Sequence, residues 1–374
     1  MGKWEMVKLG DVLKYEQPAK YIVESTDYNY QYETPVLTAG QSFVLGHTNE
    51  VDNIFTDLPV IIFDDFTTSI KYVDFPFKVK SSAMKILRAT EKGNIKYLFY
   101  YMSTLKTDTQ LHKRYWISKY TELQIPLPPL EIQQKIANAL DRASALIDKR
   151  KAQIAKLDLL IKSQFIEMFG DPVTNPKGWG KFKLENIFEI IDGDRGAQYP
   201  KQADFFDEEY CLFLNASNVT PQGFQFNTCQ FITAQKDAQL RKGKLKRHDI
   251  IVTTRGTIGN TAYYDDTITY KNIRINSGMV ILRHKKDIEP QYFIVYFKNK
   301  KVFKNLVSGT AQPQMPINNM KRALVPLPPL SLQNQFANFV QQVEAQKSLF
   351  RQSLAKLKLN YKSLMQKCFR GEIF

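Results

Sequence analysis

The sequence is poor in cysteine and histidine, and neither residue type is clustered. Its three cysteines, Cys211, Cys229 and Cys368, lie far apart and form no CxxC pair. This spacing makes a poor disulfide framework and a poor zinc site, and it fits a reducing cytosol. The four histidines are also isolated along the chain: His47, His112, His248 and His284. We therefore expect no metal site in this chain.

Long apolar runs are missing as well. No stretch approaches the ~20 consecutive apolar residues that a helix needs to span a bilayer. The first residues also lack the apolar segment of a secretory signal. Short runs such as 60–63 are expected to be buried strands. These absences predict a cytoplasmic protein with no membrane contact.

The motifs of cofactor-dependent catalysis are missing too. The chain has no G-x-x-x-x-G-K-[ST] phosphate loop and no G-x-G-x-x-G spacing. Residues 175–177 (Asn-Pro-Lys) lack the second proline and the aromatic residue of an adenine methyltransferase motif. Asp64, Asp65 and Lys71 resemble a metal-dependent nuclease centre in residue type only, because their spacing does not match. We therefore expect a non-catalytic chain with no cofactor of its own.

What the sequence does have is length, aromatic residues and positive charge. Its 374 residues are enough for two or more domains, each with its own core. The apolar fraction of 43%, with 25 Phe and 19 Tyr, predicts a folded chain. The formal net charge of +15 fits either a merely basic protein or one that binds a polyanion such as nucleic acid.

The most informative feature is an internal repeat. Residues 126–169 and 326–369 align without a gap, and both begin with Pro-Leu-Pro-Pro-Leu. Further matches pair 82–88 with 277–283 and 4–12 with 179–187. The chain is therefore a duplicated unit of roughly 180 residues, which is too long a period for a solenoid repeat. A two-fold protein of this kind implies a two-part target.

Each repeat ends in a long helical pattern. Apolar residues recur every seventh position in both copies: Leu140, Ile147, Ile154, Ile161 and Met168 in the first, and Phe336, Val343, Phe350, Leu357 and Leu364 in the second. The alternative, a helix packed on a globular core, predicts a broader apolar face and a length near the mean of ~11–12 residues. We therefore predict two coiled-coil helices that pack antiparallel and end at Gly170 and Gly371.

The remaining sequence predicts two globular domains of mixed α/β character, an α+β fold class. Short strand-like runs alternate with helical stretches and glycine-containing turns. The predicted organisation is a globular domain at 1–125, a helix at 126–170, a second globular domain at 171–325 and a helix at 326–374. Because the domains differ while the helices stay alike, we expect shared docking and separate recognition.

Candidate DNA-contacting residues follow from side-chain chemistry. Arg, Asn, Gln, Ser and Thr can read base edges, whereas Lys and Arg bind phosphates. The first domain offers Thr67, Thr68, Ser69, Lys71, Lys113 and Arg114, and the second offers Arg255, Thr257, Asn260, Asn272, Arg274, Gln312 and Gln314. Any one of these residues could instead be a turn former or an ordinary surface residue, so the prediction depends on the whole set.

Four motifs together resemble the specificity subunits of type I restriction–modification enzymes. They are 125–133 (Ile-Pro-Leu-Pro-Pro-Leu-Glu-Ile-Gln), 255–259 (Arg-Gly-Thr-Ile-Gly), 309–330 (from Gly-Thr-Ala-Gln to the second Pro-Leu-Pro-Pro-Leu) and 369–374 (Phe-Arg-Gly-Glu-Ile-Phe). The resemblance covers the whole chain. It departs in the first domain, where 64–69 replaces the Arg-Gly-Thr-Ile-Gly loop and 112–118 replaces the Gly-Thr-Ala-Gln stretch. These departures resemble a different subtype of recognition domain.

The resemblance implies a division of labour among subunits. Each globular domain would be a target-recognition domain that reads one half of a bipartite site on double-stranded DNA, with the helices setting the spacing. Two modification subunits would supply methylation with S-adenosylmethionine, and two motor–nuclease subunits would supply cleavage with ATP and Mg. This chain would contribute specificity only. A complex that only methylates, and a coiled-coil scaffold that does not bind DNA, are the alternatives.

Overall fold

The computed structural model describes residues 4–38, 42–105 and 115–374, which fall into two compact units. Unit 1 comprises Met1–Ala152 and Arg351–Phe374, and unit 2 comprises Gln153–Phe350. Both boundaries pass through the long helices. Each unit therefore holds one globular domain, the beginning of one helix and the end of the other. The predicted contact residues Lys113 and Arg114 lie outside the described residues.

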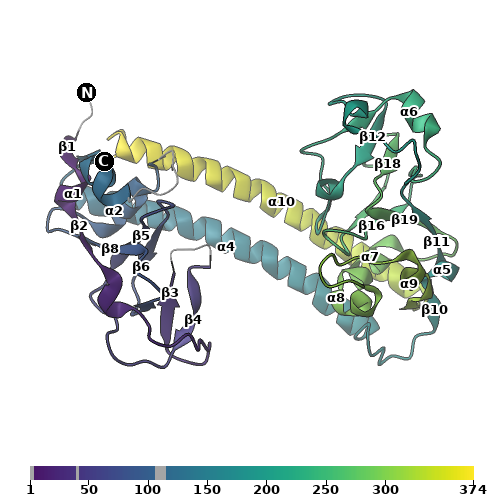
Figure 1. The fold of residues 1–374 in the computed structure, drawn as a ribbon, viewed down its shortest axis with the longest axis horizontal. Helices are drawn as coiled ribbons and strands as arrows, with labels where there is room; N and C mark the ends of the chain where they lie inside the picture. Colours follow the sequence, from purple (N-terminus) through teal and green to yellow (C-terminus); the bar gives the residue numbers. More distant parts are fainter. Residues whose placement is uncertain (1–3, 39–41, 106–114) are drawn as a thin grey trace. The chain divides into compact units, whose positions relative to one another are not determined.

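Each globular domain is built on a four-stranded antiparallel sheet, and the strand order is the same in both (Figure 1). In unit 1 the order is β2 (Leu13–Glu16), β8 (Met84–Ala89), β5 (Val60–Asp64) and β6 (Ile70–Val73). In unit 2 it is β11 (Phe188–Asp192), β19 (Met279–His284), β16 (Ile250–Thr253) and β17 (Thr261–Tyr263). The registers also agree, because Asp64 pairs with Met84 as Thr253 pairs with Met279.

A second, three-stranded sheet also recurs, with one antiparallel and one parallel strand pair. Its order is β4 (Val44–Thr48), β3 (Thr34–Leu37) and β7 (Lys78–Val79) in unit 1, and β15 (Phe231–Ile232), β12 (Cys211–Leu214) and β18 (Ile273–Ile275) in unit 2. Further antiparallel pairs join β1 (Glu5–Lys8) to β9 (Gln124–Leu127), β10 (Lys181–Lys183) to β20 (Leu324–Pro326), and β13 (Val219–Thr220) to β14 (Gly223–Phe224). The mixed α/β prediction is therefore confirmed.

Short helices complete the cores of both domains. They are α1 (Leu9–Val12), α2 (Ile95–Met102) and α3 (Tyr115–Ser118) in unit 1, and α5 (Leu184–Ile187), α6 (Ala234–Gln239), α7 (Pro290–Lys298), α8 (Lys300–Phe303) and α9 (Ile317–Arg322) in unit 2. Turns of 3-10 helix lie at Pro18–Tyr21, Tyr120–Glu122, Gln202–Asp204, Ala216–Asn218 and Lys304–Leu306. Helices α2 and α7 occupy equivalent places. In the chain, α2 follows β8 and α7 follows β19, and these two strands hold the same position in their sheets.

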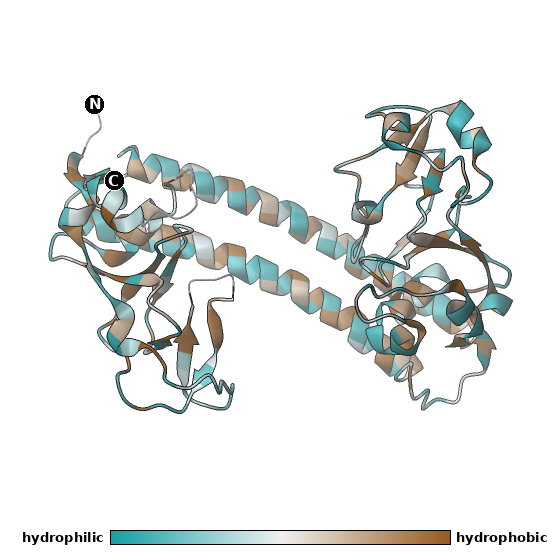
Figure 2. Cartoon of the chain, in the orientation of Figure 1, coloured by the Kyte–Doolittle hydropathy of each residue, from teal (hydrophilic) through white to brown (hydrophobic). Residues whose placement is uncertain are grey.

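Both long helices form and end where the sequence predicts. They are α4 (Leu130–Phe169) and α10 (Leu330–Phe369), each 40 residues long. Gly170 and Gly371 follow with φ of +81° and +70°, a left-handed conformation that glycine adopts without strain. Hydrophobic positions recur between hydrophilic ones along both helices (Figure 2), as a narrow apolar seam requires.

The packing of these helices is antiparallel within each unit. In unit 1, Ile136 near the start of α4 shares a core with Cys368 near the end of α10. In unit 2, the ring centroid of Phe336, near the start of α10, lies 5.5 Å from that of Phe165, near the end of α4. The start of each helix therefore packs on the end of the other, which confirms the predicted direction.

The repeated Pro-Leu-Pro-Pro-Leu segments are joined to their domains by matching hydrogen bonds. The side-chain amide of Gln133 donates to Pro128 O at 2.8 Å and accepts from Asn94 N at 2.7 Å. Gln333 repeats both bonds, donating to the equivalent proline carbonyl at 2.8 Å and accepting from Glu289 N at 3.0 Å. Both glutamines are buried. The sequence repeat is therefore also a repeat of structure.

Candidate nucleic-acid interface

Two segments that carry predicted contact residues meet in unit 2. One is the β16–β17 loop, residues 254–260, and the other is the segment 308–315. Arg255 pairs with Gln314 across the two segments as an isolated β-bridge. Four predicted residues are exposed there: Arg255, Thr257, Gln312 and Gln314. Guanidinium, amide and hydroxyl groups brought together in this way can hydrogen-bond to base edges.

Glycine and threonine shape the β16–β17 loop. Gly256 and Gly259 have φ of +68° and +86°, and a Cβ at Gly259 would lie 2.4 Å from Cζ of Phe303. The hydroxyl of Thr253 donates to Thr257 O across the turn. The Arg-Gly-Thr-Ile-Gly sequence therefore forms a tight loop that leaves its arginine and threonine side chains exposed.

Two predicted asparagines are placed differently. The side-chain amide of Asn260 donates to Val219 O at 3.0 Å, which ties the loop to the β13–β14 hairpin. Asn272 precedes β18 and is half-buried, and its carbonyl accepts from Leu212 N at 3.0 Å. The structure therefore gives Asn260 a loop-shaping role and places Asn272 on the three-stranded sheet rather than on the loop pair.

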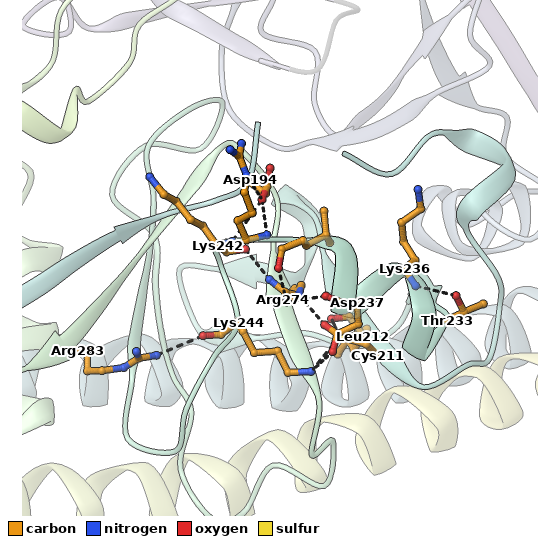
Figure 3. Close-up of polar contacts among 12 residues, drawn as sticks. Asp194, Cys211, Leu212, Thr233, Lys236, Asp237, Lys242, Lys244, Arg274 and Arg283 are labelled. Carbon is orange, nitrogen blue, oxygen red and sulfur yellow. Dashed lines mark hydrogen bonds and ion pairs between the residues drawn. The ribbon is translucent and has the colours of Figure 1, made fainter. Parts of the chain in front are cut away.

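Arg274 does not offer a free side chain to DNA (Figure 3). It is only 6% exposed, and its Nε lies 2.5 Å from Asp237 Oδ1. Its terminal nitrogens donate to the carbonyls of Asp237, Leu240 and Lys242 at 2.8, 3.0 and 2.6 Å. Burial raises the pKa of Asp237, but hydrogen bonds from Lys244 and Arg274 outweigh it, so the pKa is lowered. We therefore assign Arg274 a structural role in place of the predicted base contact.

A further group of basic residues, which the sequence analysis did not find, is gathered by Asp194. This carboxylate is 4% exposed and accepts from Gly196 N, Arg241 N and Lys242 N at 2.6, 2.7 and 3.3 Å. Figure 3 shows Asp194 beside Lys242. Burial raises its pKa, but these N–H groups and the Arg241 charge outweigh burial and lower the pKa. The two loops so joined carry the exposed residues Arg195, Arg241 and Lys242, which we call the basic cluster.

The basic cluster adjoins the β16–β17 loop. Arg195 Nη2 donates to Ser277 O at 3.2 Å, and the carbonyl of the next residue, Gly278, accepts from Thr254 N at 2.8 Å. The sequence signal for this cluster is weak: cations lie beside glycines in 192–196 (Asp-Gly-Asp-Arg-Gly) and in 241–244 (Arg-Lys-Gly-Lys). That signal does not reveal which turns meet, because Asp194 and Arg241 are 47 positions apart.

Equivalent segments meet in unit 1, with different chemistry. Tyr115 N donates to Asp65 O at 3.1 Å, as Met315 N donates to Thr254 O at 2.9 Å in unit 2. The β5–β6 turn therefore stands where the Arg-Gly-Thr-Ile-Gly loop stands in the other domain. This agrees with the departure that the resemblance identified at 64–69.

The β5–β6 turn carries the described candidates of the first domain. The Asp64 carboxylate accepts from Phe66 N at 2.9 Å and from Thr67 Oγ1 at 2.5 Å. Thr67 and Ser69 are exposed, Thr68 is half-buried with a φ of +59°, and Lys71 follows on β6. The structure thus places Thr67, Thr68 and Ser69 on the turn and Lys71 on the strand that follows it.

The two carboxylates considered for a nuclease centre are engaged in this turn. Asp65 Oδ1 accepts from Trp116 N at 2.8 Å, and Asp65 Oδ2 lies 3.7 Å from Lys85 Nζ. Within residues 4–38, 42–105 and 115–374, no group of three or more His, Cys, Asp or Glu is placed to hold a metal ion. In the same ranges, no helix is both long enough and apolar enough to cross a membrane.

Comparison with known proteins defines the class of this chain. A family model described as the type I restriction modification DNA specificity domain matches residues 1–158 and 176–359. The chain therefore belongs to the family of type I restriction–modification DNA specificity proteins. The two matched ranges correspond to the two copies of the repeat.

Individual relatives have the same description. The chain is 45% identical over 163 residues to the specificity subunit of the type I restriction enzyme EcoR124I/EcoR124II from Escherichia coli, a match that covers 40% of each chain. It is 24% identical over 405 aligned positions to the MjaVIII specificity subunit from Methanocaldococcus jannaschii, which covers 99% of this chain and 93% of that one.

Solved structures share the fold. The S subunit of a type I restriction-modification system from M. genitalium superposes with a TM-score of 0.58 at 15% identity, covering 98% of this chain and 96% of that one. A chain of a type I R-M system, solved in work on complex assembly and conformational transition, gives 0.57 at 18% identity, with 100% and 98% covered. At these identities the likeness establishes the fold alone.

Proposed function

We propose that this chain is the DNA-recognising subunit of a type I restriction–modification complex and that each globular domain reads one half of a bipartite site. The observation that carries the proposal is that the two domains share their sheets and differ in their loops. Both domains keep the same sheets and the same buried glutamine, yet the loops that meet at Asp65 and at Thr254 differ in sequence and in shape. The net charge of +15 supports a polyanionic target.

The proposed division of the chain follows the repeat. Residues 1–125 and 171–325 are the recognition domains, and 126–170 and 326–374 are the helical segments that set their separation. Because Gln133 and Gln333 build matching junctions, one kind of partner can bind the chain twice. We assign these junctions to two modification subunits, which hold S-adenosylmethionine. Motor–nuclease subunits would bring ATP and Mg, and the chain itself would carry no catalytic step.

Exchange of one domain tests independent reading. Residues 1–125 are replaced by the corresponding domain of a relative, and the chain is expressed with its modification subunits. Sequencing of the methylated DNA should show one half of the methylated motif changed and the other half retained. The reciprocal exchange of 171–325 is the control and should change the opposite half. If either exchange altered both halves, the domains would not read independently.

Insertion of one heptad into both α4 and α10 tests the spacing role. Seven residues lengthen a helix by roughly 10 Å and keep the apolar seam in phase. The gap between the half-sites should change while both half-sequences stay the same, because base contacts lie in the domains. An unchanged gap in a complex that still assembles would show that something other than these helices sets the spacing.

DNA binding itself separates this proposal from a scaffold that binds protein alone. Affinity of the assembled complex for duplex DNA should fall steeply as salt rises, since neutralised phosphates release counterions. A complex that assembles but does not bind DNA would favour the scaffold.

A further inference from the structure

We infer that the basic cluster, Arg195, Arg241 and Lys242, is a binding site for backbone phosphates of DNA. The inference rests on the proposed recognition function and adds a division of labour within unit 2. The basic cluster would hold the phosphates, whereas Arg255 and the segment 308–315 would face the bases.

The three turns that form the cluster approach one another too closely for side chains. A Cβ on Gly193 would lie 2.1 Å from Asn276 O, and one on Gly196 would lie 2.5 Å from Arg241 Nη2. Gly243, with a φ of +85°, would place a Cβ 3.3 Å from the Cα of Gly193. Glycine is needed at Gly193, where the neighbouring atom is backbone, and at Gly243, whose φ is left-handed; at Gly196 the flexible Arg241 side chain could move away. The backbone positions of the cations beside these glycines are therefore fixed near one another, while the side chains extend into solvent.

The positive charge of the cluster is only partly neutralised. The Arg241 side chain is 75% exposed, and its Nε is 4.0 Å from a buried Asp194 carboxylate that already accepts three backbone hydrogen bonds. The Arg195 side chain is 49% exposed, and its Nη2 forms an ion pair with Asp192 Oδ1 at 3.2 Å. The Lys242 side chain forms no hydrogen bond or ion pair with the described part of the chain. Three cations thus face solvent beside two acids, the buried Asp194 and the half-buried Asp192, and the cluster keeps a net positive charge.

Phosphate is the ligand that suits this arrangement. Exposed, flexible Arg and Lys side chains provide charge without a fixed donor pattern, which is sufficient for phosphates but not for base edges. Arg255 differs, because its loop is closed by Thr253 and bridged to Gln314, so the backbone position from which its side chain extends is defined. The contact of Arg195 with Ser277 joins the two surfaces, so one duplex could reach both.

The salt dependence of DNA binding by the complex with its modification subunits tests the inference. The variant Arg241→Gln/Lys242→Gln removes two charges but keeps the backbone bonds to Asp194. Each neutralised phosphate contributes about 0.9 to the slope of log affinity against log salt, so the slope should fall by about 1.8. Between about 50 and 200 mM salt, the wild-type complex should lose roughly twelvefold more affinity than the variant.

The variant Lys285→Gln/Lys286→Gln is the matched control. It removes the same charge beyond the opposite end of β19 and should leave the slope unchanged. The methylated motif should be retained in both variants. An unchanged slope for the cluster variant would overturn the inference, and so would a changed motif, since these side chains would then read bases.

Loss of folding can be recognised separately. If the double variant loses hydrogen-exchange protection in β18, Lys242→Gln alone provides the test, because its side chain forms no hydrogen bond or ion pair with the described residues. Its slope should fall by about 0.9, and no change would overturn the inference. Failure of the proposed function would look different, because the wild-type complex itself would then fail to bind DNA.

Discussion

The two globular domains share their sheets but close the equivalent loop by different means. In unit 2 the loop uses two positive-φ glycines, Gly256 and Gly259, and the hydroxyl of Thr253, which donates to a loop carbonyl. In unit 1 the turn uses one positive-φ residue, Thr68, and the carboxylate of Asp64, which accepts from Phe66 N and from the Thr67 hydroxyl. A residue in a sheet is constrained by the core around it, whereas a surface loop can be closed by different local hydrogen bonds or backbone conformations. The sequence of these loops can therefore change while the sheets stay the same.

A second difference lies under these loops. Strands β8 and β19 match closely, but Lys85 stands where β19 has Val280. Lys85 is 3% exposed, and its Nζ lies 3.7 Å from Asp65 Oδ2. At the position equivalent to Asp65, unit 2 has Thr254, whose hydroxyl donates to Gly278 O at 3.0 Å. Beneath the equivalent loops, the first domain thus has a buried ion pair, whereas the second domain has a hydrogen bond between neutral groups.

The largest expected effect comes from breaking that charge pair. Lys85→Met leaves the Asp65 carboxylate buried without its cation, which should cost unit 1 about 3 kcal/mol of unfolding free energy. Adding Asp65→Asn removes the stranded charge and should recover at least half of the loss. Hydrogen exchange in β5 and β8 measures both variants, with β16 and β19 as the internal control. Additive losses would mean that the two side chains do not interact.

The glycines of the other domain give the next largest effect. Gly259→Ala places a Cβ against Phe303 in a left-handed backbone conformation and should destabilise unit 2 by about 2–3 kcal/mol. Gly256→Ala is the matched control, because it has the same sign of φ but nothing within 4 Å of its Cβ. It should cost only about 1 kcal/mol of backbone strain. Equal losses for the two variants would rule out the Phe303 contact as the cause.

The repeated glutamines, Gln133 and Gln333, test a feature that the two units have in common. Gln133→Ala and Gln333→Ala each leave a buried proline carbonyl and a helix-start N–H without a partner. Each variant should lose about 2 kcal/mol, confined to its own unit. Hydrogen exchange of α2 and α7 reports the two losses separately. A large loss of stability in one unit and none in the other would mean that the two junctions have diverged in energy, although their hydrogen bonds match.

Local patterns explain what was predictable from sequence. The heptad spacing and the helix ends at Gly170 and Gly371 depend on residues close together in the sequence, so they can be predicted from it. The gapless repeat likewise predicts the two-fold organisation. The basic cluster was not predictable, because it depends on which turns approach Asp194. Arg274 illustrates the same limit: its residue type suits base reading, but all three residues of β18 are buried. Chemistry alone does not distinguish an arginine in an internal ion pair from one facing solvent.

The smallest effect, and the one most specific in pH, belongs to Asp194. Burial acts to raise its pKa, but the backbone N–H groups that bond to the carboxylate lower it below the unfolded value, which is about 3.9. A lowered folded-state pKa means that the ionised group stabilises unit 2 above about pH 4 and that this contribution is lost as pH falls through the folded-state pKa.

Asp194→Asn should therefore destabilise unit 2 by about 1 kcal/mol at neutral pH, and the gap to wild type should narrow as pH falls below about 4. Denaturant unfolding of both proteins, followed by hydrogen exchange in β18, measures the gap at neutral and acidic pH. Asp266→Asn, which removes an exposed carboxylate from the same unit, controls for net charge. A gap that stayed constant down to acidic pH would mean that the shape of the side chain, not its charge, holds the loops of the basic cluster together.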